Sequence, residues 1–264
     1  MTSWELPFRR RGLPVGSVPF AQVSLRPAEG MQTVLITYLS YYFERRPGQN
    51  LARFAALPDY HLVFGTLLRE IAAELKATFP TLQFASYTDN SPVNERLAAI
   101  QAGLAFQGKN GLCITAQGSF VFLGEILTDG KDPGLSASFS GTCGNCRRCI
   151  DNCPTGALQK EGLLTHRCLS ALTQKKGELT RQEADAIRNS GCAWGCDRCQ
   201  DCCPYNRHLP ESDLASHPGL HPRITGAELA GLSNREFRER YGDRAFAWRG
   251  KATLERNLRL TESE

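Results

Sequence analysis

The residues with the most distinctive chemistry are cysteines, and ten of the eleven lie between Cys143 and Pro204. The first run, CGNCRRCIDNCP from Cys143, has the pattern C-x2-C-x2-C-x3-C-P. This spacing is typical of bacterial [4Fe-4S] loops, in which three cysteines bind one cluster and the fourth binds another. A second run, CDRCQDCCP from Cys196, also ends at a proline. We therefore predict two [4Fe-4S] clusters.

Two clusters require eight thiolates, and the region offers ten. The cysteines that directly precede proline, Cys153 and Cys203, are expected to bind the cluster of the other run. The first cluster is then bound by Cys143, Cys146, Cys149 and Cys203. The second receives Cys153, Cys196 and Cys199 and lacks one ligand. The spacing leaves three candidates for that position: Cys168, Cys192 and Cys202.

Zinc is the competing metal, because C-x2-C pairs also build four-cysteine zinc sites. A zinc module has no need of two Cys-Pro ends, so iron–sulfur chemistry is favoured. Disulfides are disfavoured, because the cysteine number is odd and its share of the chain is far below the roughly 8–10% of disulfide scaffolds.

Composition is ordinary for a globular protein of 264 residues, with a formal net charge of +4 that permits an anionic partner. No apolar run approaches the roughly 18 residues of a membrane span. Arg9-Arg-Arg11 is followed by Gly12 and Pro14 rather than by an apolar segment, which argues against an export signal. Reduced thiols and clusters fit the cytoplasm, where we expect this chain.

The elements that position these residues follow from hydrophobic periodicity. Apolar, β-branched stretches predict strands at 33–39, 82–88 and 119–127. Helices are predicted at 60–79 and at 91–104, the latter opened by Ser91 as N-cap and a proline at its first position. Strands alternating with helices predict an α/β layer domain.

The remaining segments are predicted to be less regular. Residues 1–30 show no period and are interpreted as an irregular lead-in, and the Gly-, Ser- and Pro-rich segment 129–140 as a linker. Gly108-Lys-Asn-Gly111 lacks the spacing of a phosphate-binding loop, which favours a plain turn.

Asp89 is the acid of most interest outside the cysteine region, because it lies between a predicted strand and a predicted helix. Ligands of open α/β sheets bind at such strand ends, where a carboxyl group is able to donate a proton. By position alone, a plain turn at Asp-Asn-Ser-Pro is the favoured interpretation. The tail from Arg235 to Arg259 holds eight Lys or Arg against four Asp or Glu, which suits either RNA phosphates or a solvated helix face.

Taken together, the chain resembles the epoxyqueuosine reductase family, whose members use cobalamin and two [4Fe-4S] clusters to complete queuosine in tRNA. The resemblance runs through most of the chain and is carried by its motifs: Ala52-Arg-Phe-Ala55 with Asp59-Tyr-His61, Asp89-Asn-Ser-Pro-Val-Asn-Glu95-Arg96, Ala102-Gly-Leu-Ala-Phe-Gln-Gly-Lys-Asn110, Gly118-Ser-Phe-Val-Phe-Leu-Gly-Glu-Ile-Leu-Thr128, Cys153-Pro-Thr-Gly-Ala157, Arg167-Cys-Leu-Ser-Ala-Leu-Thr173, Gly195-Cys-Asp-Arg-Cys-Gln200, Cys203-Pro-Tyr-Asn206 and Arg249-Gly-Lys251 to Arg256-Asn257. The stretches at Asp89 and at Gly118–Thr128 are the most diagnostic.

The resemblance implies residue roles that spacing leaves open. It implies that Cys168 completes the second cluster, that Cys113, Cys192 and Cys202 are free, and that Asp89 is the proton donor. It also implies cobalamin between the α/β domain and the clusters, in contact with Ala52, Asp89, Cys113, Leu123, Ser170 and Asp197. The partners implied are tRNA and an electron donor, with no membrane, for a monomeric chain.

The fold expected is an open α/β cobalamin-binding domain at residues 1–135, a double-cluster ferredoxin-like domain at 136–215 and a basic helical tail at 216–264. We expect a short form without the C-terminal helical repeats of longer members. The function expected is reduction of epoxyqueuosine in tRNA. A cobalamin-dependent reductase of a small molecule, of the reductive dehalogenase kind, and a two-cluster electron-transfer protein are the alternatives.

Overall fold

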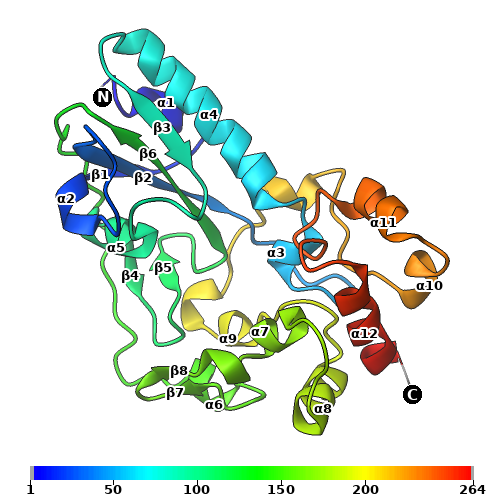
Figure 1. Ribbon diagram of the computed structural model, residues 1–264. Helices are drawn as coiled ribbons and strands as arrows, with labels where there is room; N and C mark the ends of the chain where they lie inside the picture. Colours follow the sequence, from blue (N-terminus) through cyan, green and yellow to red (C-terminus); the bar gives the residue numbers. More distant parts are fainter. Residues whose placement is uncertain (1–2, 263–264) are drawn as a thin grey trace. The chain divides into compact units, whose positions relative to one another are not determined.

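The protein is described here by a computed structural model that covers residues 3–262. It divides into two compact units, and Figure 1 labels the helices and strands of both. Unit 1 comprises residues 1–40, 60–108 and 112–144, and unit 2 comprises 41–59, 109–111 and 145–264. The predicted three-domain division stays a prediction, and the two residues at each end of the chain lie outside the described residues.

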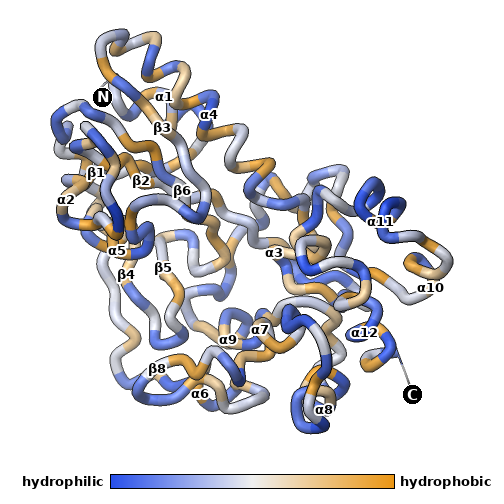
Figure 2. The backbone as a smooth tube through the Cα atoms, viewed as in Figure 1, coloured by the Kyte–Doolittle hydropathy of each residue, from blue (hydrophilic) through white to orange (hydrophobic). Residues whose placement is uncertain are grey.

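Unit 1 is built around a four-stranded antiparallel sheet of order β1-β2-β6-β3. Its elements are α1 (Leu6–Arg9), β1 (Val15–Pro19), α2 (Phe20–Val23), β2 (Thr33–Ser40), α4 (Tyr60–Thr78), β3 (Phe84–Tyr87), α5 (Glu95–Gln101), β4 (Ala105–Gln107), β5 (Cys113–Thr115) and β6 (Val121–Thr128). The α/β class is therefore confirmed. The two central strands are buried along most of their length, and Figure 2 shows β2 coloured as hydrophobic.

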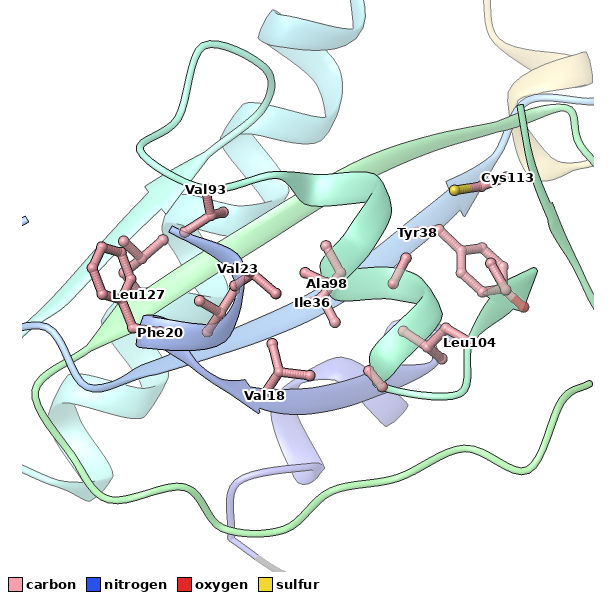
Figure 3. Packing of buried hydrophobic residues seen from close by; sticks show 14 residues of the cluster. Val18, Phe20, Val23, Ile36, Tyr38, Val93, Ala98, Leu104, Cys113 and Leu127 are labelled. Carbon is pink, nitrogen blue, oxygen red and sulfur yellow. The ribbon is translucent and has the colours of Figure 1, made fainter. Parts of the chain in front are cut away.

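Helices cover both faces of this sheet. Successive residues of a strand point to opposite sides, so each face offers side chains for a helix to pack against. Toward α4, β6 places Gly124, where a Cβ would lie 2.6 Å from Leu68 and 2.7 Å from Phe64. Glycine at this position therefore allows helix and strand to approach closely. Toward α5, Leu127 packs in a cluster with Ile36 and Ala98, as Figure 3 shows.

Two of the predictions for unit 1 are wrong. The interpretation of residues 1–30 as irregular missed the edge strand β1, which pairs with β2 from Val15 to Pro19. The predicted N-cap Ser91 is also incorrect, because α5 begins at Glu95 and the side chain of Asn94 accepts the capping bond from the Leu97 N–H. Ser91 instead accepts the backbone N–H of Val93 in a local turn at 3.1 Å.

The segment predicted as a linker, 129–140, has no regular structure but is anchored to unit 1. The N–H of Ala137 donates to the carbonyl of Ala102, and that of Phe139 to the carbonyl of Gly103. Gly103 follows the last turn of α5 in the left-handed region at φ +70°, where helix ends favour glycine.

Unit 2 consists of short helices and turns joined by long loops. Its elements are α3 (Arg53–Ala56), α6 (Arg148–Asp151), β7 (Leu158–Gln159), β8 (Gly162–Leu163), α7 (Leu169–Gln174), α8 (Arg181–Ser190), α9 (Arg198–Asp201), α10 (Gly226–Leu229), α11 (Asn234–Tyr241) and α12 (Lys251–Glu262), with 3-10 turns at Thr165–Arg167, Pro204–Asn206 and Asp213–Ser216. Three of the helices begin with a capping box, at Thr180, Thr225 and Ser233.

Hydropathy in unit 2 follows burial, with α11 coloured as hydrophilic in Figure 2 and only Phe237 and Tyr241 of that helix buried. Within residues 3–262, no helix combines the length and the apolar character that crossing a membrane requires.

Replacing Gly103 by alanine is expected to destabilise the protein more than the same change at Gly134. Both glycines have φ near +70°, which costs a residue with a side chain roughly 1–2 kcal/mol. Only at Gly103 would the new Cβ overlap a neighbour, the carbonyl oxygen of Ala137 at 2.0 Å. Overpacking of this kind adds about 1–3 kcal/mol. Urea unfolding of both variants measures the difference, and equal losses would contradict the described anchoring of 129–140.

Candidate functional site

The two cysteine loops have the same local structure, displaced by 50 residues. Cys149 is the second residue of the four-residue helix α6, and Cys199 occupies the same position in α9. In each loop a cysteine that precedes proline follows the helix, at Cys153 and at Cys203. The second loop has Ala193 where the first has Cys143. It therefore offers one cysteine fewer than the first loop, which agrees with the prediction that an outside cysteine completes its cluster.

The side chain of Cys153 is placed to act as a thiolate. Burial opposes its ionisation, but the backbone N–H groups of Leu158, Thr155 and Ala157 outweigh that effect and lower the pKa of the thiol. Hydrogen bonds from the backbone to sulfur are also a means by which proteins tune the potentials of iron–sulfur clusters.

Two thiols of the predicted second cluster, Cys196 and Cys199, are affected by the charges of neighbouring thiols. Burial is the main cause that raises the pKa of Cys196 to about 11, with smaller contributions from Asp197, Cys168 and Cys153. Burial also raises the pKa of Cys199, with added repulsion from Cys196 and Cys168 and a smaller one from Cys149. Cys202 instead experiences Cys149 and Cys203, which belong to the predicted first cluster. This grouping supports Cys168 as the fourth ligand of the second cluster, which stays a prediction.

The three cysteines predicted to be free have a different environment. Each sulfur donates to a backbone carbonyl: Cys113 to Arg96 at 3.9 Å, Cys192 to Trp194 at 3.5 Å and Cys202 to Cys199 at 3.6 Å. A thiolate bound to iron has no proton to donate, so these contacts suit protonated thiols. In the second loop, Cys202 also occupies the C-cap position that Asn152 holds after α6.

All eleven cysteines are free of disulfides, so the eight predicted ligands retain thiols that fit two iron–sulfur clusters. Cys143 belongs to unit 1, at its boundary, and the other seven lie in unit 2. Among residues 3–262, no group of three or more His, Cys, Asp or Glu side chains is arranged to hold a metal ion.

A buried arginine holds the second cysteine loop to the segment 41–59 of unit 2. The guanidinium of Arg53 lies 3.1 Å from Asp197 and 2.6 Å from Asp201, and its Nε donates to the carbonyl of Phe43 at 2.7 Å. The backbone N–H of Arg53 also donates to Asp197 at 2.9 Å. The side chains of Arg53 and Asp197 are only 5% and 1% exposed. Asp197 is therefore neutralised within the protein, and this loop is fixed by a residue that the cysteine pattern does not indicate.

The predicted cobalamin contacts divide equally between the units. In unit 2, Ala52 donates its N–H to the carbonyl of Trp194, and the missing Cβ of Gly195 leaves room for the Ala52 methyl, which would otherwise lie 2.5 Å away. Ser170 is joined to the same loop through Thr173, whose hydroxyl donates to the Ser170 carbonyl and accepts the Gly195 N–H. Asp197 follows one residue after Cys196.

In unit 1, the predicted contacts are Asp89, Cys113 and Leu123; Cys113 belongs to the core cluster beside α5, and Leu123 packs against that cluster. The six residues fit cobalamin only in part. Asp89 is exposed and Leu123 and Ser170 are half-buried, whereas Ala52, Cys113 and Asp197 are at most 5% exposed within the protein.

Asp89 lies on an exposed loop between β3 and α5, in the left-handed region at φ +64°. Its Oδ2 accepts the hydroxyl of Tyr60 at 3.3 Å and lies 3.8 Å from Nε2 of His61. Tyr60 is itself stacked on Phe122 of β6, with ring centroids 4.6 Å apart. A carboxyl group held by a tyrosine beside a histidine, on an accessible loop, has the character of a proton donor.

A second acid, Glu125, lies behind this loop and was not identified from the sequence. It occupies the middle of β6, opposite Ile36 on β2 and Tyr87 on β3, and is 0% exposed. Among the described residues, neither of its carboxyl oxygens has a hydrogen-bond partner. Burial raises its pKa to about 8, the hydroxyl of Ser91 lowers it, and the charges of Glu95 and Asp89 raise it. The only available signal was an acid inside an otherwise apolar strand.

Glu95, the first residue of α5, is half-buried, so it is less exposed than Asp89 and more exposed than Glu125. Burial raises its pKa to about 7, with a further increase from Asp89, while Arg96 and His61 lower it. Asp89, Glu95 and Glu125 are named the acid cluster below. Near neutral pH, Glu95 and Glu125 are able to retain protons that isolated carboxyl groups would release.

The other motifs have structural partners. Lys109 of the predicted turn donates to the carbonyl of Cys146 at 3.0 Å, in the first cysteine loop. In the basic tail, Arg256 donates to the carbonyls of Lys175 and Gly177, and Lys251 forms an ion pair with Glu255 at 3.1 Å. These two cations of the tail are therefore engaged within unit 2.

The class of protein follows from these loops. Residues 142–206 match the family model described as a 4Fe-4S double cluster binding domain, which covers both cysteine runs. The chain therefore contains a domain that binds two iron–sulfur clusters.

Curated relatives and solved structures extend the match beyond these loops. An epoxyqueuosine reductase of Gloeobacter violaceus is 38% identical over 247 residues, covering 87% of this chain and 76% of that protein. One of Bacillus anthracis is 38% identical over 209 residues, covering 76% of this chain and 53% of that protein. The chain thus belongs to the epoxyqueuosine reductase family, and it spans about half the length of several curated relatives.

The fold agrees with this membership. A crystal structure of a selenomethionine-labelled epoxyqueuosine reductase has a TM-score of 0.84 at 26% identity, covering 97% of this chain and 79% of that one. A second crystal structure, of an epoxyqueuosine reductase with an epoxyqueuosine-modified tRNA-Tyr stem loop, has a TM-score of 0.77 at 31% identity, covering 88% and 64%.

Replacing Arg53 by methionine is expected to lower the free energy of unfolding by roughly 3–5 kcal/mol, because it leaves the buried Asp197 carboxylate unpaired. Methionine retains an apolar side chain of similar length. The matched control is Arg235→Met, which removes an ion pair with Glu239 whose side chains are 81% and 63% exposed. Such pairs contribute about 0–1 kcal/mol. Urea unfolding of apoprotein measures both, and similar losses would argue against a clamp at Arg53.

Glu125 is expected to make the stability of the protein fall as the pH rises. Its carboxyl is protonated in the folded chain up to about pH 8, whereas in the unfolded chain it ionises near 4.5. Unfolding therefore releases a proton between these values, and stability falls by up to ~1.4 kcal/mol per pH unit.

The variant Glu125→Gln removes this proton and should flatten that part of the profile, whereas Glu29→Gln, at an exposed position of unit 1, should leave it unchanged. Urea midpoints measured from pH 4.5 to 8.5 test this expectation. An identical slope in Glu125→Gln and the wild type would refute it.

Proposed function

We propose that this protein reduces epoxyqueuosine to queuosine in tRNA, with two [4Fe-4S] clusters, cobalamin and Asp89 as the proton donor. The observation that carries the proposal is that a member of the epoxyqueuosine reductase family has an exposed aspartate held by Tyr60 and His61 in unit 1, and that its eight predicted cluster ligands are free of disulfides. The electron donor and a monomeric state remain predictions. Action on tRNA implies a cytoplasmic protein.

When bound, the clusters supply single electrons and the cobalt supplies reducing power at carbon. Cys143, Cys146, Cys149 and Cys203 would hold one cluster, and Cys153, Cys168, Cys196 and Cys199 the other. Asp89, Leu123 and Ser170 offer side-chain surface for the corrin. Asp89 protonates the oxygen that leaves the epoxide carbon, because its carboxyl lies on an accessible loop and Tyr60 orients it.

The tRNA partner is supported by the relative solved with an epoxyqueuosine-modified stem loop. In this chain, the side chain of Trp248 is 57% exposed, and the guanidinium of Arg249 lies 3.5 Å from the centre of its ring. Arginine stacked on an exposed aromatic ring is a surface on which unpaired bases stack and phosphates bind. We propose this pair as a contact to the RNA.

Anaerobic reconstitution with iron, sulfide and cobalamin, followed by incubation with a reductant and tRNA that carries epoxyqueuosine, tests the proposal directly. We expect queuosine in the digested tRNA, measured by mass spectrometry. Absence of queuosine from a preparation with both clusters and cobalamin verified would contradict the proposed activity.

Asp89→Asn is expected to lower the rate of queuosine formation by about 10²- to 10⁴-fold, the usual contribution of a positioned general acid. Asparagine tolerates the left-handed backbone at φ +64°, so the loop should be retained. Iron content should be unchanged. The control is Asp213→Asn, at an exposed position of unit 2, and equal rates for the two variants would exclude Asp89 as the donor.

A further inference from the structure

The proposed reaction consumes more protons than Asp89 carries. Converting an epoxide to an alkene breaks two C–O bonds, and the oxygen leaves as water. The balance is one epoxide, two electrons and two protons giving one alkene and one water. The electrons come from the reduced metal cofactors of the proposed function. A single carboxylic acid supplies one of the two protons.

The source of the second proton has to operate while substrate covers Asp89. Without substrate, the side chain of Asp89 is 61% exposed to water. A modified nucleoside bound against this loop would shield it from solvent. A second protonated group connected to Asp89 from inside the protein avoids that restriction.

Glu125 has the properties that such a group requires. It is fully buried in unit 1, and neither carboxyl oxygen has a hydrogen-bond partner among the described residues. Its cross-strand neighbours Ile36 and Tyr87 offer no cation to pair with a carboxylate. Burying an unpaired carboxylate costs several kcal/mol, so the group stays neutral and retains a proton.

The strand register brings the β3–α5 loop close to Glu125 within unit 1, because Tyr87, two residues before Asp89, lies opposite Glu125. The titratable and polar groups that act on Glu125 are Ser91 and Asp89 of the β3–α5 loop and Glu95 of α5. Glu95 in turn interacts with Asp89, Arg96 and His61. The three members of the acid cluster run from fully buried Glu125, through half-buried Glu95, to exposed Asp89.

We propose that Glu125 is the proton reserve of this site and, through Glu95 and Ser91, reprotonates Asp89 after its first proton has been used. This inference rests on the proposed function. In the step, the O–H bond of Glu125 breaks and an O–H bond of Asp89 re-forms. Asp89 then protonates the departing hydroxide to water. Glu125 regains its proton from solvent when the product leaves and Asp89 is again exposed.

The proton moves from Glu125 toward Asp89 because of the chemistry of the group that accepts it and of the group that gives it up. A departing hydroxide is a far stronger base than any carboxylate, so protonating it drives the transfer. The carboxylate left at Glu125 is unfavourable in its apolar surroundings, which favours return of the proton before the next turnover. Glu125 acts through Asp89 and does not touch the substrate.

Infrared spectra of the reconstituted holoprotein test the reserve without substrate. At pH 7 the wild type should show the carbonyl band of a buried, protonated carboxylic acid, and Glu125→Gln should lose it. Glu29→Gln, an exposed position in unit 1, should keep the band. If Glu125→Gln keeps the whole band, the reserve is overturned.

The pH profile of queuosine formation tests the delivery. Solvent protons are plentiful at low pH, and Glu125 still holds its proton at pH 7.5, so Glu125→Gln should lose roughly threefold at pH 6 and more than thirtyfold at pH 7.5, within the range expected for general acid catalysis. Glu95→Gln, which leaves the buried strand intact, should show the same trend. A loss that is equal at both pH values would indicate only a structural role and overturn the inference.

The two proposals fail in different ways. A wild-type protein with intact clusters and cobalamin that forms no queuosine at any pH contradicts the proposed function, and the delivery role falls with it. If the wild-type protein forms queuosine and the Glu125→Gln and Glu95→Gln variants show the same pH profile as the wild type, only the proton reserve is contradicted.

Discussion

Repulsion between buried thiolates is the constraint on which the cysteine region depends. Cys168 and Cys153 raise the pKa of Cys196, and Cys196 and Cys168 raise that of Cys199. Four negative sulfurs in a half-buried site are stable only when positive charge is bound among them. The irons of the proposed cluster would provide that charge.

Arg53 is the residue that makes this arrangement rigid. Its guanidinium neutralises Asp197 between two predicted cysteine ligands and joins the loop to a segment more than 140 positions earlier in the chain. In unit 1, a buried acid has no cation beside it among the described residues. Glu125 is buried without a cation, so its carboxyl is kept neutral instead of being paired. The same cost of burying charge thus yields a fixed ion pair in one unit and a retained proton in the other.

Local patterns were enough to predict much of this molecule. The cysteine spacing identified both loops, and apolar periodicity placed β2, β3, β6 and α4 within a few residues of their bounds. Family resemblance, rather than spacing, singled out Cys168, and the observation that Ala193 stands in the place of Cys143 explains why spacing alone left it open.

Features that depend on distant partners were missed. The edge strand β1 is defined by its pairing with β2, and its own five residues contain a glycine and a proline. Ser91 and Asn94 are equally good caps by type. The choice is made by residues 92–94, which bond in extended form to Val23 and Leu25, so that α5 cannot begin earlier. The roles of Arg53 and Glu125 likewise depend on residues that are distant in the sequence, so the sequence alone did not predict them.

Iron and sulfide analysis of single cysteine variants tests the central claim, that eight specific thiolates bind two clusters. Reconstituted wild type should contain about eight irons per chain, as two [4Fe-4S] clusters require. Cys168→Ala should fall to about four, whereas Cys192→Ala and Cys202→Ala, whose thiols donate to carbonyls, should keep about eight. Zinc in place of iron, or a loss at Cys192 or Cys202 with none at Cys168, would contradict the account.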